Sequence, residues 1–317
     1  MHIDLHCDTI YRMKECSYPQ ILWKNGFHVD IQKLKQVKSV LQCFALYADF
    51  GKTQQNEGAW NYIQSLYQIA LKEFQDNGAD LQWVRSLSEL HKAQEAGKIG
   101  AMLTLEEGGV VEGDMGRLDR LYAMGIRIAS LTWNYPNCMG YPATNPMYRK
   151  SGLTSFGKDA VVHMQDMGMI VDVSHLSDQG FWDVLELADK PIMATHSNAR
   201  AITGHPRNLT DDMIRALGQA GGVMGLNFCA AFLHHTHPKM RIKDVIRHLD
   251  HIRSVGGEDV LAIGTDFDGI GCELEIAHAG QMDKLYDQLG KGGFTPRQVD
   301  KLLRDNVLRV FGDTFQR

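Results

Sequence analysis

Short apolar runs alternate along the chain with longer stretches in which apolar residues recur every three or four positions. This alternation is typical of parallel strands that are buried on both faces and joined by crossover helices. Eight runs have the character of strands, at 3–5, 40–46, 101–105, 126–131, 169–173, 192–194, 222–226 and 261–264. Helices are expected at 60–76, 115–124, 156–167, 180–188, 211–217, 242–255, 282–290 and 296–310. The pattern predicts an α/β fold, a (β/α)8 TIM-type barrel.

Capping residues support two of these helix starts. Thr210 precedes two acidic residues and an apolar run, and Thr295 is followed by a proline at the first helical position. Because no repeat or linker divides the sequence, we expect one barrel domain over residues 1–317. This domain would carry a helical insertion at about 53–97 and C-terminal helices at about 282–317. The insertion and the loop 134–151 are the segments that we expect to shape the substrate pocket.

Composition narrows the class of protein and of partner. With 317 residues, 44% of them hydrophobic and 22% charged, the chain has the material for one large globular core. A formal net charge of −5 favours neither nucleic acid nor an anionic membrane, so a small substrate is expected. The N-terminus has no signal-peptide pattern and no membrane span is expected, which predicts a cytoplasmic location. Six cysteines without a CxxC pair are expected to be reduced thiols rather than a disulfide framework.

Potential metal ligands follow several of the predicted strands, on the end of the barrel where catalytic residues gather. Side chains alternate along a strand, so the spacing of two residues lets His6 and Asp8 reach one metal ion. A carboxylate such as Glu107 could bridge to a second ion completed by His175 and His196. Imidazole and carboxylate are zinc ligands, and two metals about 3.5–4 Å apart can deprotonate a bridging water and polarise a carbonyl.

The other histidines carry less weight. Three of them, His234, His235 and His237, stand close together, but no carboxylate accompanies them at ligand spacing, so we interpret them as part of a solvated loop. A further group lies in predicted helices or loops without partners, and ordinary exposed or half-buried histidine is the better interpretation there: His28, His91, His163, His248, His251 and His278.

Several segments, in the right order and across nearly the whole chain, resemble the membrane dipeptidase (renal dipeptidase) family of zinc peptidases, within the amidohydrolase-like barrel group. The segments are Asp4-Leu-His-Cys-Asp8, Glu107-Gly-Gly109, Gly152-Leu-Thr-Ser-Phe-Gly157, Gly168-Met-Ile-Val-Asp-Val-Ser-His175, Thr195-His-Ser-Asn-Ala-Arg200, His205-Pro-Arg-Asn-Leu-Thr-Asp211 and Ile263-Gly-Thr-Asp-Phe-Asp-Gly269. The resemblance implies a first zinc on His6 and Asp8, a second on His175 and His196, Glu107 as the bridge and Asp266 as the acid/base. It also suggests a homodimer.

The resemblance further implies a binding site for the terminal carboxylate of the substrate. In the family an arginine followed by an asparagine fills this role, and Arg207 and Asn208 stand in that place. The planar guanidinium matches a carboxylate with two parallel hydrogen bonds, although a surface ion pair is the alternative from the residues alone. One position departs from the family: its Leu-Thr-His reads Leu131-Thr132-Trp133. The indole N–H of Trp133 can donate a hydrogen bond in place of the histidine, or the ring can pack against the substrate.

We therefore expect a binuclear zinc dipeptidase that cleaves small dipeptides through a hydroxide bridging two zinc ions. A related metal-dependent hydrolase of another small amide, lactam or ester is the alternative, because one metal pair serves many acyl substrates. A barrel that has lost catalysis and serves as a scaffold is a second alternative. A phosphoesterase is disfavoured, since no Gly-rich or Lys-rich loop that would bind phosphate follows a strand.

Overall fold

The computed structural model describes residues 1–16, 21–53, 56 and 58–315. Eight parallel strands form a closed barrel, in which β1 pairs with β2 and β10, and β2 pairs with β4 to complete the ring. The strands are β1 (Ile3–Asp4), β2 (Leu41–Tyr47), β4 (Ile99–Glu106), β5 (Ile126–Ser130), β6 (Ile170–Asp172), β7 (Met193–Ala194), β8 (Val223–Leu226) and β10 (Leu261–Ile263). All eight lie at predicted runs, which confirms the (β/α)8 barrel.

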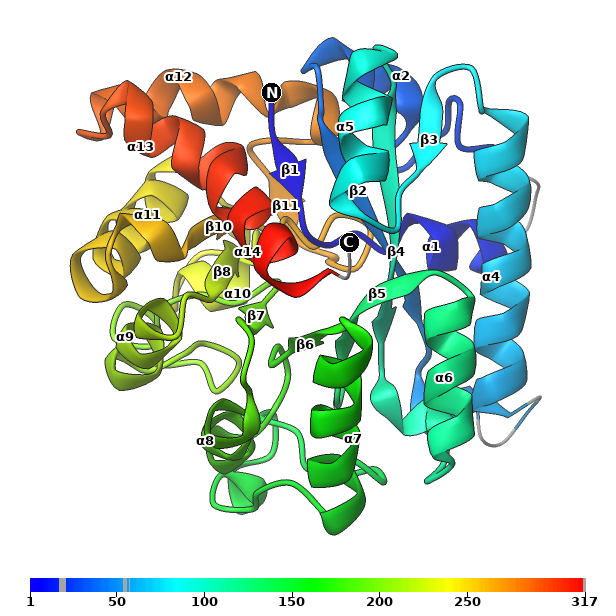
Figure 1. Cartoon of the computed structure of the whole chain (residues 1–317). Helices are drawn as coiled ribbons and strands as arrows, with labels where there is room; N and C mark the ends of the chain where they lie inside the picture. Colours follow the sequence, from blue (N-terminus) through cyan, green and yellow to red (C-terminus); the bar gives the residue numbers. More distant parts are fainter. Residues whose placement is uncertain (17–20, 54–55, 57, 316–317) are drawn as a thin grey trace.

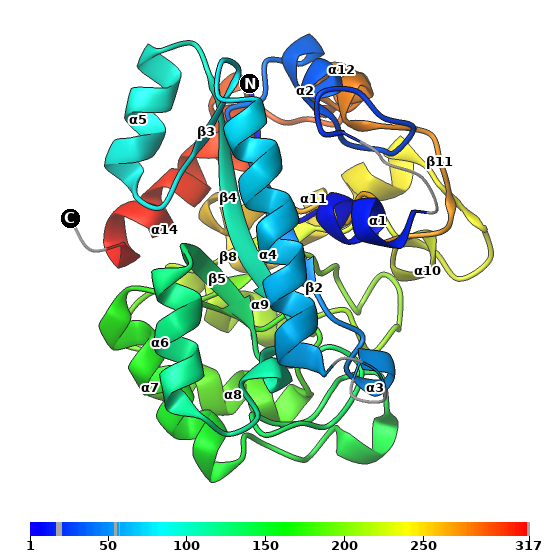
Figure 2. The same cartoon turned by 90° about the vertical axis from the view of Figure 1, so that its right-hand side faces the viewer.

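Residues 53–97, expected to be helical, also contain a strand. Between α4 (Ala59–Asp76) and α5 (Leu87–Glu95) lies β3 (Leu81–Trp83), which pairs in parallel with the start of β4. Further along, β4 pairs on with β5, so β3 occupies the part of the β4 edge that β5 leaves free. Figure 2 shows α4 running along the outside of β2 and β4. The sequence of β3, Leu81-Gln82-Trp83, is interrupted by a polar residue and is not a continuous apolar run of the kind that predicted the barrel strands.

The remaining helices surround the strands (Figure 1). They are α1 (Thr9–Glu15), α2 (Ile31–Gln36), α3 (Phe50–Thr53), α6 (Met115–Ala123), α7 (Ser155–Met167), α8 (Asp178–Leu187), α9 (Asp211–Gln219), α10 (Ala230–Leu233), α11 (Ile242–Gly256), α12 (Asp283–Lys291), α13 (Pro296–Asp300) and α14 (Asn306–Thr314). A short parallel pair, β9 (Lys239–Met240) and β11 (Glu273–Leu274), lies outside the barrel sheet. Within the described residues, no helix is both long and apolar enough to cross a membrane.

The predicted caps are present. The Thr210 side chain accepts a hydrogen bond from Met213 N at the start of α9, and Thr295 forms a capping box with Gln298 at the start of α13. The chain predicted as one helix from 296 to 310 is α13, a π-helical turn (Lys301–Asp305) and α14. These caps satisfy backbone N–H groups that the first helical turn leaves without partners.

The last helix closes one mouth of the barrel. In α14, Val307, Val310 and Phe311 are buried in one apolar cluster with residues that begin strands, such as Ile170 and Val223. Figure 1 shows α14 (red) in front of the strands, at the centre of the ring of helices. Because the strands are parallel, their N-terminal ends are covered by α14 and their C-terminal ends meet at the opposite mouth.

Candidate metal centre

Five potential ligands meet at the C-terminal mouth. His6 and Asp8 follow β1, Glu106 is the last residue of β4, and His175 and His196 follow β6 and β7. All five side chains are buried. His175 has a backbone φ of 69°, in the left-handed region that non-glycine residues rarely adopt. Such local strain is concentrated at functional sites in proteins.

The Glu106 carboxylate lies between two groups of ligand atoms. Its Oε2 is 3.2 Å from His6 Nε2, which is itself 3.4 Å from Asp8 Oδ2. Its Oε1 is 2.9 Å from His175 Nε2 and 3.7 Å from His196 Nε2. His175 Nε2 and His196 Nε2 are themselves 2.9 Å apart. One oxygen of Glu106 thus faces each half of the cluster, the arrangement that a carboxylate bridging two cations needs.

This geometry corrects the expectation for Glu107. Its Oε1 accepts hydrogen bonds from Gly109 N (2.6 Å) and from Asn137 Nδ2, and its Oε2 accepts one from Trp133 N (3.1 Å). The side chain therefore holds two loops together and is not part of the ligand cluster. Strand β4 extends one residue beyond its predicted end, and neighbouring strand residues point in opposite directions, so Glu106 rather than Glu107 faces the other ligands.

Asp266 lies beside the cluster as expected. Its Oδ1 is 4.0 Å from His6 Nε2, and its Oδ2 accepts a hydrogen bond from Asn227 Nδ2 at 2.8 Å. The pKa of Asp266 is raised to about 8, chiefly by burial and also by the nearby carboxylates of Asp8 and Glu106, against the opposing effect of His6. A carboxyl group that changes protonation near neutral pH is suited to acid/base chemistry. Asn227, which no sequence pattern singled out, follows β8 at the same mouth of the barrel.

Arg207 is buried close to the two histidines of the second half. Its Nη2 donates to the backbone oxygen of His196 at 3.3 Å, whereas its buried Nε makes no hydrogen bond within the described part of the chain. Asn208, expected to bind substrate, donates to the carbonyl oxygens of Thr203 and Phe232, both at 2.8 Å, and its buried Oδ1 has no hydrogen-bond partner in the described part of the chain. Its amide N–H groups are thus used to hold the loop that carries Arg207.

Trp133 forms part of an aromatic wall with Tyr47 and Tyr135. The Trp133 ring centroid is 5.0 Å from that of Tyr47, 5.9 Å from that of Tyr135 and 6.3 Å from that of His175. Its backbone N–H is bound by Glu107, which fixes the loop on which the ring stands. The indole therefore borders the ligand cluster on the side of His175.

The imidazole of His196 is oriented by a hydrogen-bond network that no sequence pattern predicted. Its Nδ1 is 2.8 Å from Thr195 Oγ1, which donates to Asp172 Oδ2 at 2.6 Å. The other Asp172 oxygen accepts the backbone N–H groups of Ser174 and Thr195, both at 2.9 Å. Partners of this kind set the ring orientation and the tautomer of metal-binding histidines. Here they leave Nε2 of His196 facing the cluster.

The family model of the membrane dipeptidases (peptidase family M19) matches residues 1–316. The chain belongs to this family. A Klebsiella pneumoniae protein described as an uncharacterized protein in the pqqA 5′ region is 34% identical over 243 residues, 73% of this chain and 88% of that protein. Membership of family M19 supports a metal-dependent dipeptidase.

Solved structures agree in fold. The crystal structure of a dipeptidase described as a metallopeptidase of family M19 has a TM-score of 0.91 at 25% identity, covering 99% of this chain and 98% of that one. A metallopeptidase from Rhodobacter sphaeroides, liganded with a phosphinate mimic of the dipeptide L-Ala-D-Ala, has a TM-score of 0.90 at 24% identity and covers 99% of both chains.

The electrostatics of this M19 site fit divalent cations. Asp8, Glu106 and Asp266 bring three carboxyl groups together, and the guanidinium of Arg207 lies close enough to interact with Asp266 and Glu106. Burial lowers the pKa of His196 well below its usual value, which keeps the imidazole neutral, the form that binds metals. Asp8 Oδ1 and His6 Nε2 are buried without a hydrogen bond in the described part of the chain. Buried carboxylate and imidazole atoms that have no hydrogen-bond partner are stabilised when they coordinate a cation.

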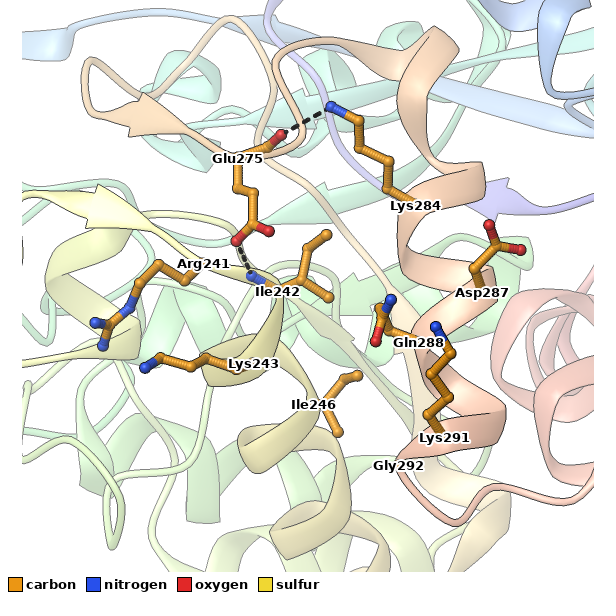
Figure 3. A pocket seen from close by; sticks show the side chains of 10 residues that line it. All are labelled: Arg241, Ile242, Lys243, Ile246, Glu275, Lys284, Asp287, Gln288, Lys291 and Gly292. Carbon is orange, nitrogen blue, oxygen red and sulfur yellow. Dashed lines mark hydrogen bonds between the residues drawn. The ribbon is translucent and has the colours of Figure 1, made fainter.

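A cavity of about 750 Å³ lies elsewhere, between α11 and α12 (Figure 3). Its lining includes Lys243 and Lys291, and Glu275, which accepts a hydrogen bond from Ile242 N at 2.9 Å. The residues described as lining it include no histidine or cysteine and none of the ligand cluster. In the described part of its lining, this cavity therefore lacks the imidazole ligands that gather at the mouth of the barrel.

Proposed function

We propose that the chain is a zinc-dependent dipeptidase that holds two zinc ions with His6, Asp8, Glu106, His175 and His196. The position of Glu106 carries the proposal, because its two oxygens face two separate pairs of ligands. A zinc pair at this place would lower the pKa of a shared water and polarise the scissile carbonyl.

The residues around the ligands transfer the proton, bind the substrate carboxylate and pack against the substrate. Asp266, held by Asn227, takes a proton from the attacking water and returns it to the leaving amine. Arg207 binds the free carboxylate of the dipeptide, and its unpartnered buried Nε supports this role. A longer peptide would not bring its terminal carboxylate to Arg207, which favours dipeptides. Trp133 packs against the substrate as part of the aromatic wall.

Hydrolysis of a substrate panel by metal-free and zinc-loaded protein tests this function. The panel contains L,L- and L,D-dipeptides, among them both Ala-Ala isomers, together with N-acyl amino acids, lactams and lactones. We expect about two zinc ions per chain and cleavage of dipeptides only when zinc is present. Faster turnover of lactones or N-acyl amino acids would favour the alternative hydrolase, and a protein that binds no metal would favour the scaffold.

A further inference from the structure

Two cysteines from distant parts of the chain meet beside the catalytic mouth. Cys229 follows β8 and precedes α10, and Cys272 lies in the loop between β10 and β11. Cys272 Sγ accepts a hydrogen bond from the backbone N–H of Ala230 at 3.4 Å and lies 3.9 Å from the carbonyl oxygen of Phe228, so it contacts the residues on both sides of Cys229. The Cys272 sulfur therefore lies against the turn that carries Cys229, and both cysteines are free thiols.

The Cys272 thiol has a lowered pKa and is accessible to small reagents. Donation from the Cys229 thiol and from Ala230 N, acting against burial, lowers the pKa of Cys272 to about 6. The residue is only partly buried and lines a cavity of about 240 Å³ together with Arg12 and His28. Thiolates of low pKa that small reagents can reach are the cysteines that oxidise selectively.

We propose that Cys229 and Cys272 are a redox-active thiol pair that a hydroperoxide converts into a disulfide. The Cys272 thiolate attacks the outer oxygen of the peroxide, the O–O bond breaks, and the leaving oxygen takes up a proton as an alcohol or water. The resulting sulfenic acid at Cys272 is attacked by the Cys229 sulfur, which loses its proton as water leaves. Two thiols lose two electrons and two protons in total, and the peroxide accepts them.

The disulfide would act on the position of Asp266. Asn227 Oδ1 accepts the backbone N–H of Cys229 at 2.6 Å, and Asn227 Nδ2 donates to Asp266 Oδ2 at 2.8 Å. A bond from Cys229 to the loop that follows Asp266 therefore ties together both segments that place this carboxyl group. We expect oxidation to slow turnover. This effect rests on the proposed function, whereas formation of the disulfide does not.

Thiol chemistry on the intact, metal-loaded protein tests the pair. Limiting iodoacetamide at pH 6 should label Cys272 about tenfold faster than an ordinary thiol of pKa about 8.5, after allowing for its lower nucleophilicity. Cys138, also partly buried, is the internal reference. After hydrogen peroxide and alkylation, peptide mass mapping should find Cys229 linked to Cys272. In Cys229→Ser the oxidation should stop at a sulfenic acid that dimedone traps, while the matched control Cys138→Ser still forms the link.

Equal labelling of Cys272 and Cys138, or peroxide treatment without the linked peptide, overturns the proposal. Turnover and metal content are measured on the same samples. We expect dipeptide turnover to fall on oxidation at unchanged metal content and to return with dithiothreitol, except in Cys229→Ser, where no disulfide can form. A linked peptide with unchanged turnover refutes the coupling to Asp266. Lack of turnover in the reduced protein counts against the proposed function, and the linked peptide still decides the thiol pair.

Discussion

Replacing Glu106 with Gln is the sharpest test of the metal centre. The carboxylate approaches His6 on one side and His175 and His196 on the other, at 2.9 to 3.7 Å. Glutamine keeps the size but offers one oxygen and one NH2 group, so in either orientation one half of the cluster faces N–H donors in place of an anionic ligand. Changes even to the outer partners of metal ligands lower metal affinity or activity about 10- to 100-fold, so the loss here should be at least about 100-fold in kcat/KM. Zinc content, measured by mass spectrometry of the metal, should fall from two to one or none.

Glu107→Gln is the matched control, since it makes the same change one residue along. The Glu107 carboxylate accepts three N–H groups, from Gly109, Asn137 and Trp133, and an amide turned to serve the first two leaves the third unpaired. One unpaired buried donor costs about 1–3 kcal/mol, so urea unfolding should show lower stability while two zinc ions remain bound. If Glu107→Gln empties the site and Glu106→Gln keeps both ions, the assignment of the bridging carboxylate is wrong.

Three further predictions concern single side chains. Asp266→Asn should keep two zinc ions by metal analysis and lose about 10²- to 10⁴-fold in kcat, because the amide cannot carry the proton; near-normal turnover would exclude Asp266 as the acid/base. Arg207→Met should raise KM and lower kcat/KM about 100-fold for dipeptides, because two hydrogen bonds between charged groups contribute about that factor to binding. Dipeptide amides lack the carboxylate, so kcat/KM for them should change little. An equal loss on both substrates would contradict the assignment. His248 is buried as a neutral ring that accepts from Ala199 N and lies 3.1 Å from the carbonyl oxygen of Leu233, and burial lowers its pKa to about 4. The pKa of His248 in the folded protein lies below the value of about 6.5 in the unfolded chain. Its contribution to the free energy of unfolding, about 3 kcal/mol, is therefore present above pH 6.5 and is lost as the pH falls toward 4. Urea unfolding of metal-free protein should show this loss to be smaller in His248→Gln, and the same pH dependence in both proteins would refute the linkage.

Much of the barrel could be predicted because its strands are buried on both faces and read as continuous apolar runs. The ends of those runs also predicted the place of His6, Asp8, His175, His196 and Asp266, since strands that run parallel bring their C-terminal ends to one mouth. The prediction that missed a strand concerned one short segment. Strand β3 has the polar Gln82 at its centre and is not a continuous apolar run, and its pairing with β4 depends on an edge that only the assembled barrel offers.

By itself, the sequence determined the barrel, the family and the catalytic mouth, because periodicity and ordered motifs are properties of the chain. It did not choose between Glu106 and Glu107, since adjacent residues differ only in the face to which they point, and that choice depends on where β4 ends and pairs with Tyr47 of β2. Nor could it show that the Asn208 amide group binds its own loop, that Asn227 holds Asp266, or that Cys272 lies against the turn that carries Cys229. Each of these is a contact between segments far apart in sequence or a competition for hydrogen bonds, and only the tertiary structure decides which partner lies within reach.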